Sequence, residues 1–125
     1  MCGICGAAGL SDEGLMARMC DCMKHRGPDS TGFYTDGYFS LGADRLSIID
    51  LQGGNQPIHN EEGTIQLIFN GEVYNYVELR RELEQKGHEF YTDSDTETVI
   101  HAYEEWGAAC LKRINGMFAF ALADT

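Results

Sequence analysis

The order of strand-like and amphipathic segments constrains the fold of this 125-residue chain more than any other feature. Apolar or alternating runs of strand length fall at 3–10, 32–50, 64–69, 88–92 and 116–122. Helical stretches lie between them, at 13–24, 77–86 and 95–106, with a short one at 108–113. Because short connections favour antiparallel neighbours, we predict an α+β fold in which helices cover antiparallel sheets.

Glycine and apolar anchors set the expected strand boundaries in the first half of the chain. We expect the segment 32–50 to form two short strands around Gly42. Its apolar residues Leu46, Ile48 and Ile49 are expected to be buried anchors of the second strand.

Two local signals predict the boundaries in the second half. The pair Asn70-Gly71 is a turn signal, so we expect the strand 64–69 to end there and a helix to follow. Ser94 and Glu97 have the spacing of a capping box. In that motif the serine hydroxyl accepts from the Glu97 N–H, and the glutamate carboxylate reaches back to the serine N–H.

The apolar run 116–122 lies only three residues before the end of the chain. A strand this apolar is expected to have a partner on each side, because an exposed apolar edge invites aggregation. The alternative is that this run is an edge strand, but we expect the sequence to be a truncated piece of a longer protein.

The formal net charge of −11 limits the classes of partner. Nucleic acids and anionic membrane surfaces are bound mainly through Lys and Arg, so we expect neither as a partner. The chain has no apolar run near the roughly 18 residues of a membrane span, and its N-terminus lacks the basic and apolar regions of a signal peptide. We expect a cytoplasmic protein.

Five cysteines leave one alternative function open. An odd number without an export signal indicates reduced thiols. The pairs Cys2/Cys5 and Cys20/Cys22 could form a metal-binding or redox module, although the second spacing is tight for zinc.

The second residue is the strongest candidate for a nucleophile. If Met1 is removed, Cys2 carries both a thiol and a free α-amine. An α-amino group has a pKa of about 7.7 to 8.0, which suits a general base near neutral pH. One residue would then supply nucleophile and base, as in enzymes with an N-terminal threonine.

Three other places carry polar groups in apolar surroundings. Arg45 could grip a carboxylate through two parallel hydrogen bonds, or form a structural ion pair with Asp44 or Asp50. The side-chain amide of Asn70 beside the Gly71 N–H could hold an oxyanion, although an ordinary turn is the alternative.

Asp95 could bind an ammonium group, or be an ordinary first-turn carboxylate stabilised by the helix dipole. Together the four places form a coherent site for an amino-acid amide. The thiolate attacks the carboxamide, the arginine binds the α-carboxylate, and an acid binds the α-ammonium. This interpretation needs no metal site and no catalytic histidine, although a Cys/His dyad stays open.

Six sequence blocks occur in the order seen in class II glutamine amidotransferases. The chain resembles, over its whole length, the glutaminase domain of glutamine-hydrolysing asparagine synthetases. The blocks are Cys2-Gly-Ile-Cys-Gly, His25-Arg-Gly-Pro-Asp29, Arg45-Leu-Ser-Ile-Ile-Asp50, Asn70-Gly-Glu-Val-Tyr-Asn75, Ser94-Asp-Thr-Glu97 and Gly116-Met-Phe-Ala-Phe-Ala-Leu122.

The resemblance implies a fold and a set of roles. The fold is the αββα sandwich of N-terminal-nucleophile hydrolases, and the activity is hydrolysis of L-glutamine to L-glutamate and ammonia through a γ-glutamyl thioester. Cys2 would be the nucleophile, with Asn70 and Gly71 as the oxyanion hole. The segment 25–29 would be a structural loop near the nucleophile. The implied substrate-binding residues are Arg45, Leu46, Ser47, Ile48, Ile49, Asn70, Gly71, Glu72 and Asp95.

The resemblance also implies what lies outside residues 1–125. These residues would be the N-terminal part of a type 2 glutamine amidotransferase domain. The remainder of that domain and an ATP-dependent synthetase domain that amidates aspartate would follow it. The glutaminase half-reaction needs no cofactor, whereas the synthetase domain uses ATP and Mg. The expected partners are L-glutamine and that synthetase domain, and a homodimer is left open.

Overall fold

The computed structural model describes all residues, 1–125, and contains two three-stranded sheets. The first has the order β1-β3-β2 and the second β4-β5-β6, and every pairing is antiparallel. The strands are β1 (Gly3–Ala8), β2 (Ser30–Thr35), β3 (Phe39–Arg45), β4 (Ile58–His59), β5 (Ile65–Val73) and β6 (Gly116–Asp124). The helices are α1 (Glu13–Met23), α2 (Tyr76–Gln85), α3 (Asp95–Trp106) and the 3₁₀ helix η1 (Gly107–Lys112).

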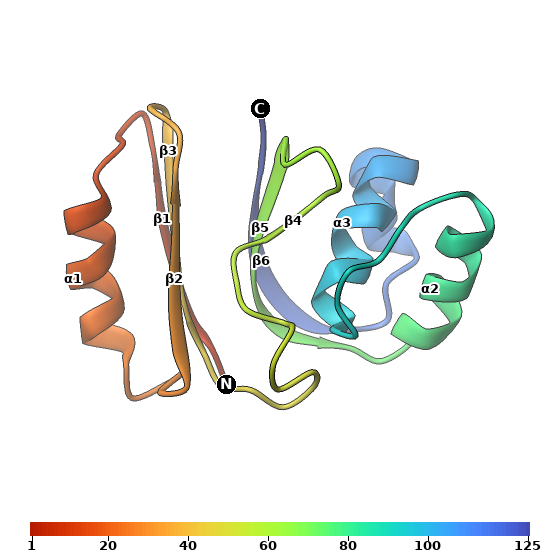
Figure 1. Cartoon of the computed structure of the whole chain (residues 1–125), viewed down its shortest axis with the longest axis horizontal. Coiled ribbons are helices and arrows are strands. Elements are labelled where there is room, and N and C mark those ends of the chain that lie inside the picture. Colours follow the sequence, from red (N-terminus) through yellow and green to blue (C-terminus); the bar gives the residue numbers. More distant parts are fainter.

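The elements form four layers. Helix α1 covers the outer face of the first sheet, α2 and α3 lie outside the second sheet, and the two sheets face each other (Figure 1). This is the predicted αββα sandwich of antiparallel sheets. No helix combines the length and apolar character of a membrane span.

Alternation along β5 divides its side chains between two apolar layers. Leu67 and Phe69 belong to the larger core cluster, which α3 completes with Val99 and Ile100. Ile68 points the other way and belongs to the cluster between the sheets. Because successive side chains of a strand point to opposite faces, the later even-numbered positions of β5 also face the first sheet.

The layer between the sheets is lined by small residues on one side. In β6 the larger side chains Phe118 and Phe120 pack with the helix-side core, whereas Ala121 and Ala123 pack between the sheets. Leu41 of β3 lies opposite these alanines in the same cluster. Small side chains allow the two sheets to approach closely.

The helix boundaries agree well with the sequence. Asp12 caps α1 by accepting a hydrogen bond from the Leu15 N–H at 2.8 Å. Helix α3 ends at Gly107, which has a positive φ of 57°. The stretch expected as a helix near 108–113 is the 3₁₀ helix η1.

Six local expectations were wrong, and three of them concern residues before position 64. The hairpin between β2 and β3 turns at 36–38, where Asp36 accepts from the Tyr38 and Phe39 N–H groups, and Gly42 lies within β3. The segment 46–50 is a loop, and Ile48 is 62% exposed instead of buried. No strand was expected at 51–63, where the short strand β4 lies.

Asn70-Gly71 is not a turn. The strand β5 continues to Val73 because β6 pairs with it along its whole length, and Gly71 lies opposite Phe118. A Cβ atom on Gly71 would lie 2.2 Å from the Met117 carbonyl oxygen, so the close approach of β6 requires glycine there.

The segment 88–92 is not a strand, and Glu97 explains why. Its carboxylate accepts from the N–H groups of Tyr91 and Thr92 at 2.8 and 2.7 Å, which replaces the ladder bonds of a strand. The expected capping box is therefore wrong in detail. The Ser94 hydroxyl accepts from the Thr96 N–H, and the Ser94 N–H donates to the Thr92 hydroxyl.

We predict that Gly27→Ala destabilises the fold by about 1–3 kcal/mol, as overpacked sites do. A Cβ atom at Gly27 would lie 2.1 Å from the Asp44 carbonyl oxygen, where backbone meets backbone. Urea unfolding would measure the loss. Gly14→Ala is the matched control, because it lies in the first turn of α1 and alanine favours helix. Equal stability of both variants would contradict the prediction.

Candidate active site

Three strands place polar side chains on the inner faces at one end of the sandwich. Gly3 pairs with Asp44, so one further step places Cys2 beside Arg45. Leu41, Ala43 and Arg45 are alternate positions of β3, so their side chains lie on the same face of the sheet. Leu41 and Ala43 belong to the cluster between the sheets. Asn70 follows Ile68 by two residues on β5 and therefore shares its face. The side chains of three separate strands thus converge.

A pocket of about 180 Å³ lies where they meet. Nine of the ten site residues expected from the sequence line it, and the exception is Ser47. The structure therefore brings together Cys2, which precedes β1, with residues from β3, β5, β6, the N-terminus of α3 and the loop after β3. The lining residues are Met1, Cys2, Arg45, Leu46, Ile48, Ile49, Gln56, Phe69, Asn70, Gly71, Glu72, Ser94, Asp95, Thr96 and Met117.

Cys2 is half-buried at the edge of this pocket. Its Sγ atom lies 3.8 Å from the Leu46 carbonyl oxygen, and its own carbonyl accepts from Arg26 Nε at 3.2 Å. The backbone of Cys2 is thus held by the loop 25–29, while its thiol faces the pocket-lining loop. The expectation that the segment 25–29 lies near this cysteine is confirmed.

The same loop also positions the residues that follow β3. The Asp29 carboxylate accepts from the Ser47 N–H at 2.7 Å, and the Asp29 N–H donates to the Arg45 carbonyl at 3.0 Å. Ser47 therefore contributes to the site through its backbone position and not as part of the pocket wall.

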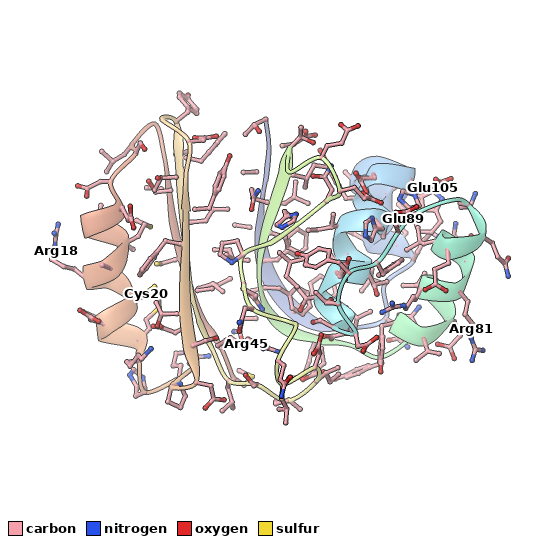
Figure 2. All side chains as sticks on the ribbon, in the orientation of Figure 1. Arg18, Cys20, Arg45, Arg81, Glu89 and Glu105 are labelled. Carbon is pink, nitrogen blue, oxygen red and sulfur yellow. The ribbon has the colours of Figure 1, made fainter.

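Arg45 is a buried cation without a carboxylate partner. It is only 4% exposed, and no ion pair of the structure includes it. Its Nη2 donates to the carbonyl oxygens of Ile49 and Asp50 at 2.7 and 2.6 Å, and Nη1 lies 3.4 Å from Asn55 Oδ1. Figure 2 shows Arg45 between the two sheets, whereas Arg81 points outward.

The alternative ion pairs for Arg45 do not form. Asp44 instead pairs with Lys24 at 3.5 Å and accepts from Thr31. Asp50 accepts from the N–H groups of Asp93 and Gly53, and these bonds, with the nearby Arg45 charge, hold the pKa of Asp50 below its ordinary value. Because burying an unpaired charge is costly, the Arg45 guanidinium is suited to an anionic ligand.

The side-chain amide of Asn70 has unused hydrogen-bonding capacity. Its Oδ1 is buried and has no partner within the protein. Such buried polar atoms are rare in folded proteins, and in a pocket wall they point to a ligand.

Two carboxylates of the pocket influence each other. Burial raises the pKa of Glu72, and the nearby Asp95 charge raises it further. Burial also raises the pKa of Asp95, although its Oδ2 accepts from the Val73 N–H at 2.8 Å. With Arg45 in the same pocket, the site combines a cation with two acids. That pattern of charge matches a zwitterionic amino acid.

Several pocket residues were missed by the sequence analysis. Gln56 lies in the loop before β4 and supports the wall by accepting from the Phe69 N–H at 2.7 Å. Ser94 and Thr96 flank Asp95 at the start of α3, and Met117 comes from β6. No local pattern marks Gln56 or Met117, since both reach the pocket through tertiary packing. The capping motif could have suggested the other two.

The four thiols of the alternative function do not assemble. The Sγ atoms of Cys5 and Cys20 lie 3.8 Å apart, between β1 and α1. Burial is the largest cause that raises the pKa of Cys20, the neighbouring Cys5 thiol is the second, and together they raise it to about 12. Cys2 lies in the pocket and Cys22 is exposed. None of them belongs to a cluster of potential metal ligands. The structure therefore offers no support for a cysteine-based metal or redox module.

Comparison with known proteins decides the family. A family described as the glutamine amidotransferase domain matches residues 1–125. The chain belongs to this family. The first sheet, the second sheet and the pocket between them are thus parts of a glutamine amidotransferase domain.

Curated relatives place this amidotransferase domain near the asparagine synthetases. It is 44% identical to asparagine synthetase [glutamine-hydrolyzing] 1 of Bacillus subtilis over 98% of this chain and 20% of that protein. It is 42% identical to the corresponding enzyme 1 of Arabidopsis thaliana over 100% of this chain and 22% of that protein. The chain therefore spans about a fifth of the length of these relatives.

A solved structure supports the fold independently. The glutamine phosphoribosylpyrophosphate amidotransferase of B. subtilis, complexed with ADP and GMP, superposes with a TM-score of 0.78. The match covers 97% of this amidotransferase domain and 35% of that chain, at 20% identity. At this identity the likeness concerns the fold alone.

We predict that the free energy of unfolding of Asp95→Asn, relative to that of the wild type, increases as the pH rises. The folded-state pKa of Asp95 is raised, so ionisation of this group costs stability as the pH rises past its ordinary value of about 3.9. Asparagine lacks that cost and can still accept from the Val73 N–H. Urea unfolding below about pH 4 and near pH 8 would measure the difference.

Asp36→Asn is the control with the opposite sign. Hydrogen bonds from the Phe39 and Tyr38 N–H groups lower the pKa of Asp36, so its contribution to stability is lost as the pH falls. Replacing it should cost more at high pH than at low pH. Parallel pH trends for the two variants would refute the assignment of Asp95.

Proposed function

We propose that this chain is the glutamine-hydrolysing part of an asparagine synthetase, and that its pocket converts L-glutamine to L-glutamate and ammonia. The observation that carries the proposal is the buried Arg45, which has no carboxylate partner and lines the same pocket as Cys2. The names of the curated relatives support the same substrate.

The charges of the pocket give glutamine one orientation. The guanidinium of Arg45 binds the α-carboxylate, and the acids Glu72 and Asp95 bind the α-ammonium group. The side chain of the substrate then extends toward Cys2 and Asn70. Leu46, Ile48 and Ile49 line the pocket beside it, and Arg45 itself holds the carbonyl of Ile49 in place.

In the first chemical step Cys2 attacks the γ-carboxamide. The thiol proton moves to the free α-amine of Cys2, a bond forms between Sγ and the amide carbon, and the carbonyl electrons move onto oxygen. Asn70 Nδ2 and the Gly71 N–H stabilise this oxyanion. The carbon–nitrogen bond then breaks, and the nitrogen leaves as ammonia with the proton held by the Cys2 ammonium.

The second step hydrolyses the γ-glutamyl thioester. The Cys2 amine takes a proton from water, the resulting hydroxide adds to the thioester carbon, and the carbon–sulfur bond breaks. The products are glutamate and the regenerated thiol. This chemistry needs no cofactor, but it does require that Met1 is removed, since an amide nitrogen at Cys2 is not a base.

The ammonia would serve a second reaction in the whole protein. The relatives are about five times as long as this chain, which leaves room for the rest of the amidotransferase domain and for a synthetase domain. We propose that the synthetase domain uses ATP and Mg to activate aspartate, and that ammonia from this pocket displaces the activated group.

We predict that a glutamine analogue with an electrophilic side chain labels wild-type protein once and does not label Cys2→Ala. The reason is that Cys2 is the one cysteine that lines the pocket. Intact-mass analysis measures the label and shows in the same experiment whether Met1 has been removed. Chains that retain Met1 should stay unlabelled.

Cys22→Ala is the matched control, because it removes an exposed thiol on α1. It should label as the wild type does. A label that persists in Cys2→Ala would overturn the proposed nucleophile.

We predict that Arg45→Ala raises the KM for glutamine by roughly 30-fold to several thousand-fold, since losing one partner of a buried charge pair costs about 2–5 kcal/mol. Steady-state ammonia release measures the change. Arg81→Ala, on the exposed face of α2, should leave KM unchanged. An Arg45→Ala variant that folds and keeps the wild-type KM would exclude the carboxylate-binding role.

A further inference from the structure

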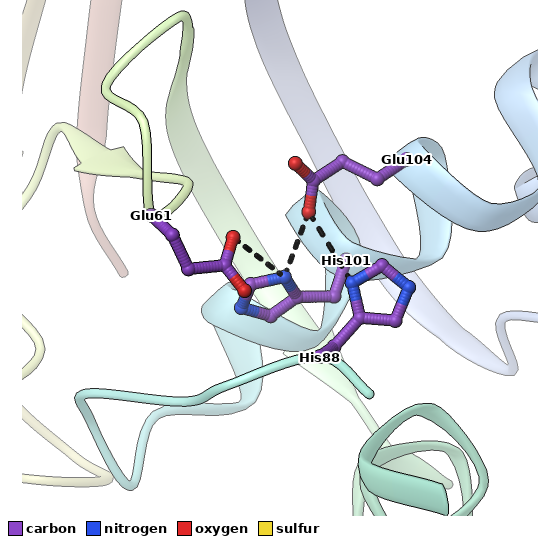
Figure 3. A group of neighbouring side chains, drawn as sticks. All are labelled: Glu61, His88, His101 and Glu104. Atoms are coloured by element: carbon purple, nitrogen blue, oxygen red, sulfur yellow. Dashed lines mark hydrogen bonds and ion pairs between the residues drawn. The ribbon is translucent and has the colours of Figure 1, made fainter. Parts of the chain in front are cut away.

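A second cluster of polar side chains lies away from the pocket, beside α3. It consists of Glu61, His88, His101 and Glu104, and one nitrogen or oxygen atom of each lies within 4.8 Å of the others (Figure 3). None of the four lines the active-site pocket. The residues come from three segments: the loop after β4, the segment before α3, and α3 itself.

Short contacts define the centre of the cluster. Nδ1 of His101 lies 2.9 Å from Oε2 of Glu104 and 3.8 Å from Oε2 of Glu61. Nδ1 of His88 lies 3.5 Å from the same oxygen of Glu104. Two imidazole nitrogens and two carboxylate oxygens therefore point toward one another.

Both histidines are held from behind by a carboxylate. Nε2 of His101 lies 3.4 Å from Oε1 of the fully buried Glu97, and Nε2 of His88 lies 3.3 Å from Oε2 of Glu105. When the outer ring nitrogen carries the proton and donates it to this carboxylate, the inner nitrogen has a free lone pair. This arrangement of carboxylate, imidazole and metal is usual for histidine ligands in proteins.

Both glutamates are anchored in the same manner. The outer oxygen Oε1 of Glu61 accepts from the Glu89 N–H at 3.0 Å. The outer oxygen Oε1 of Glu104 accepts from Nδ2 of Asn60 at 2.8 Å. In each glutamate the other oxygen, Oε2, faces the cluster.

In that tautomer the four inner atoms are all electron-pair donors. With the outer nitrogens protonated, the lone pair of His101 Nδ1 would meet the Glu104 carboxylate at 2.9 Å without a cation between them. No Lys or Arg side chain forms an ion pair with Glu61 or Glu104. The cluster therefore needs a positive species at its centre.

We propose that Glu61, His88, His101 and Glu104 form a structural binding site for a divalent transition-metal cation of the zinc type. Two imidazoles and two carboxylates are a donor set that zinc accepts in tetrahedral geometry, and two carboxylates balance its charge. Ligand distances near 2.0–2.2 Å require the atoms to move closer together. Glu61 can do so because 39% of its side chain is exposed.

Such a metal would join segments that have little other regular structure between them. The segment 88–92 forms no strand ladder and is held by side-chain carboxylates. A metal bound to His88 and to two residues of α3 would fasten this segment to the helix that begins at Asp95. We therefore expect metal to raise the thermal stability of the protein.

Titration of metal-free protein with zinc, against a chromophoric chelator, tests the site. The wild type is expected to bind a single zinc ion at this site, and its Tm should rise with zinc. His88→Gln and Glu61→Gln, both at the accessible side of the cluster, should weaken zinc binding by at least about tenfold, since ligand loss should cost no less than loss of an outer partner. Circular dichroism checks that both variants fold.

Control variants separate this site from other histidines and from the thiols. His25→Gln, in an exposed loop, and Cys2→Ala should bind zinc as the wild type does. Cobalt in the site should give the visible absorption of a tetrahedral complex without a thiolate charge-transfer band. Glu105→Gln should weaken binding by roughly 10–100-fold by releasing the His88 ring.

Three outcomes would overturn the proposal. The first is a wild-type protein that binds no zinc, in which case protons on the imidazoles occupy the centre. Burial lowers the pKa of His101, but the carboxylates of Glu97 and Glu104 raise it by more, which favours such a protonated state. The second is equal affinity of the wild type and His88→Gln. The third is a cobalt spectrum with a thiolate band that Cys2→Ala abolishes.

Discussion

The face-to-face packing of two antiparallel sheets is the constraint on which the rest of the structure depends. Along β1, β3 and β5 the side chains alternate, so one set faces helices and the other set meets between the sheets. Most of the inner positions are apolar. At one end of the sheets the inward-facing positions carry Cys2, Arg45 and Asn70 instead of apolar residues. The pocket forms there, where these polar side chains meet between the sheets.

The charge of Arg45 fixes the conformation of the loop at this end of the layer between the sheets. Its guanidinium holds the carbonyls of Ile49 and Asp50, and it leaves no room for a side chain at Gly54, where a Cβ atom would lie 2.6 Å from Nη2. The loop after β3 is thus shaped around a cation whose own charge is unbalanced. A ligand carboxylate would complete this arrangement, which ties substrate binding to the local structure of the loop.

Helix boundaries and the α+β class could be predicted from the sequence, because caps, glycines and periodicity are local. The four-layer sandwich was implied by the resemblance to class II glutamine amidotransferases. The strand expected at 88–92 could not be recognised as wrong from the sequence, since the carboxylates of Glu61 and Glu97 satisfy backbone N–H groups within it. Nor could the continuation of β5 through Asn70-Gly71 be predicted, because it depends on β6 pairing with it. The pocket members Gln56 and Met117 carry no local signal at all.

The sequence by itself determined which residues could do chemistry: a cysteine at position two, an arginine in an apolar run, an amide beside a glycine, and an acid at a helix start. Their order also determined the family. Only the tertiary structure decided that Arg45 has no carboxylate partner, that Asn70 lies within a strand, and that two histidines 13 positions apart face the same two glutamates. The physical reason is that burial and charge pairing are properties of contacts between distant segments, which no local pattern encodes.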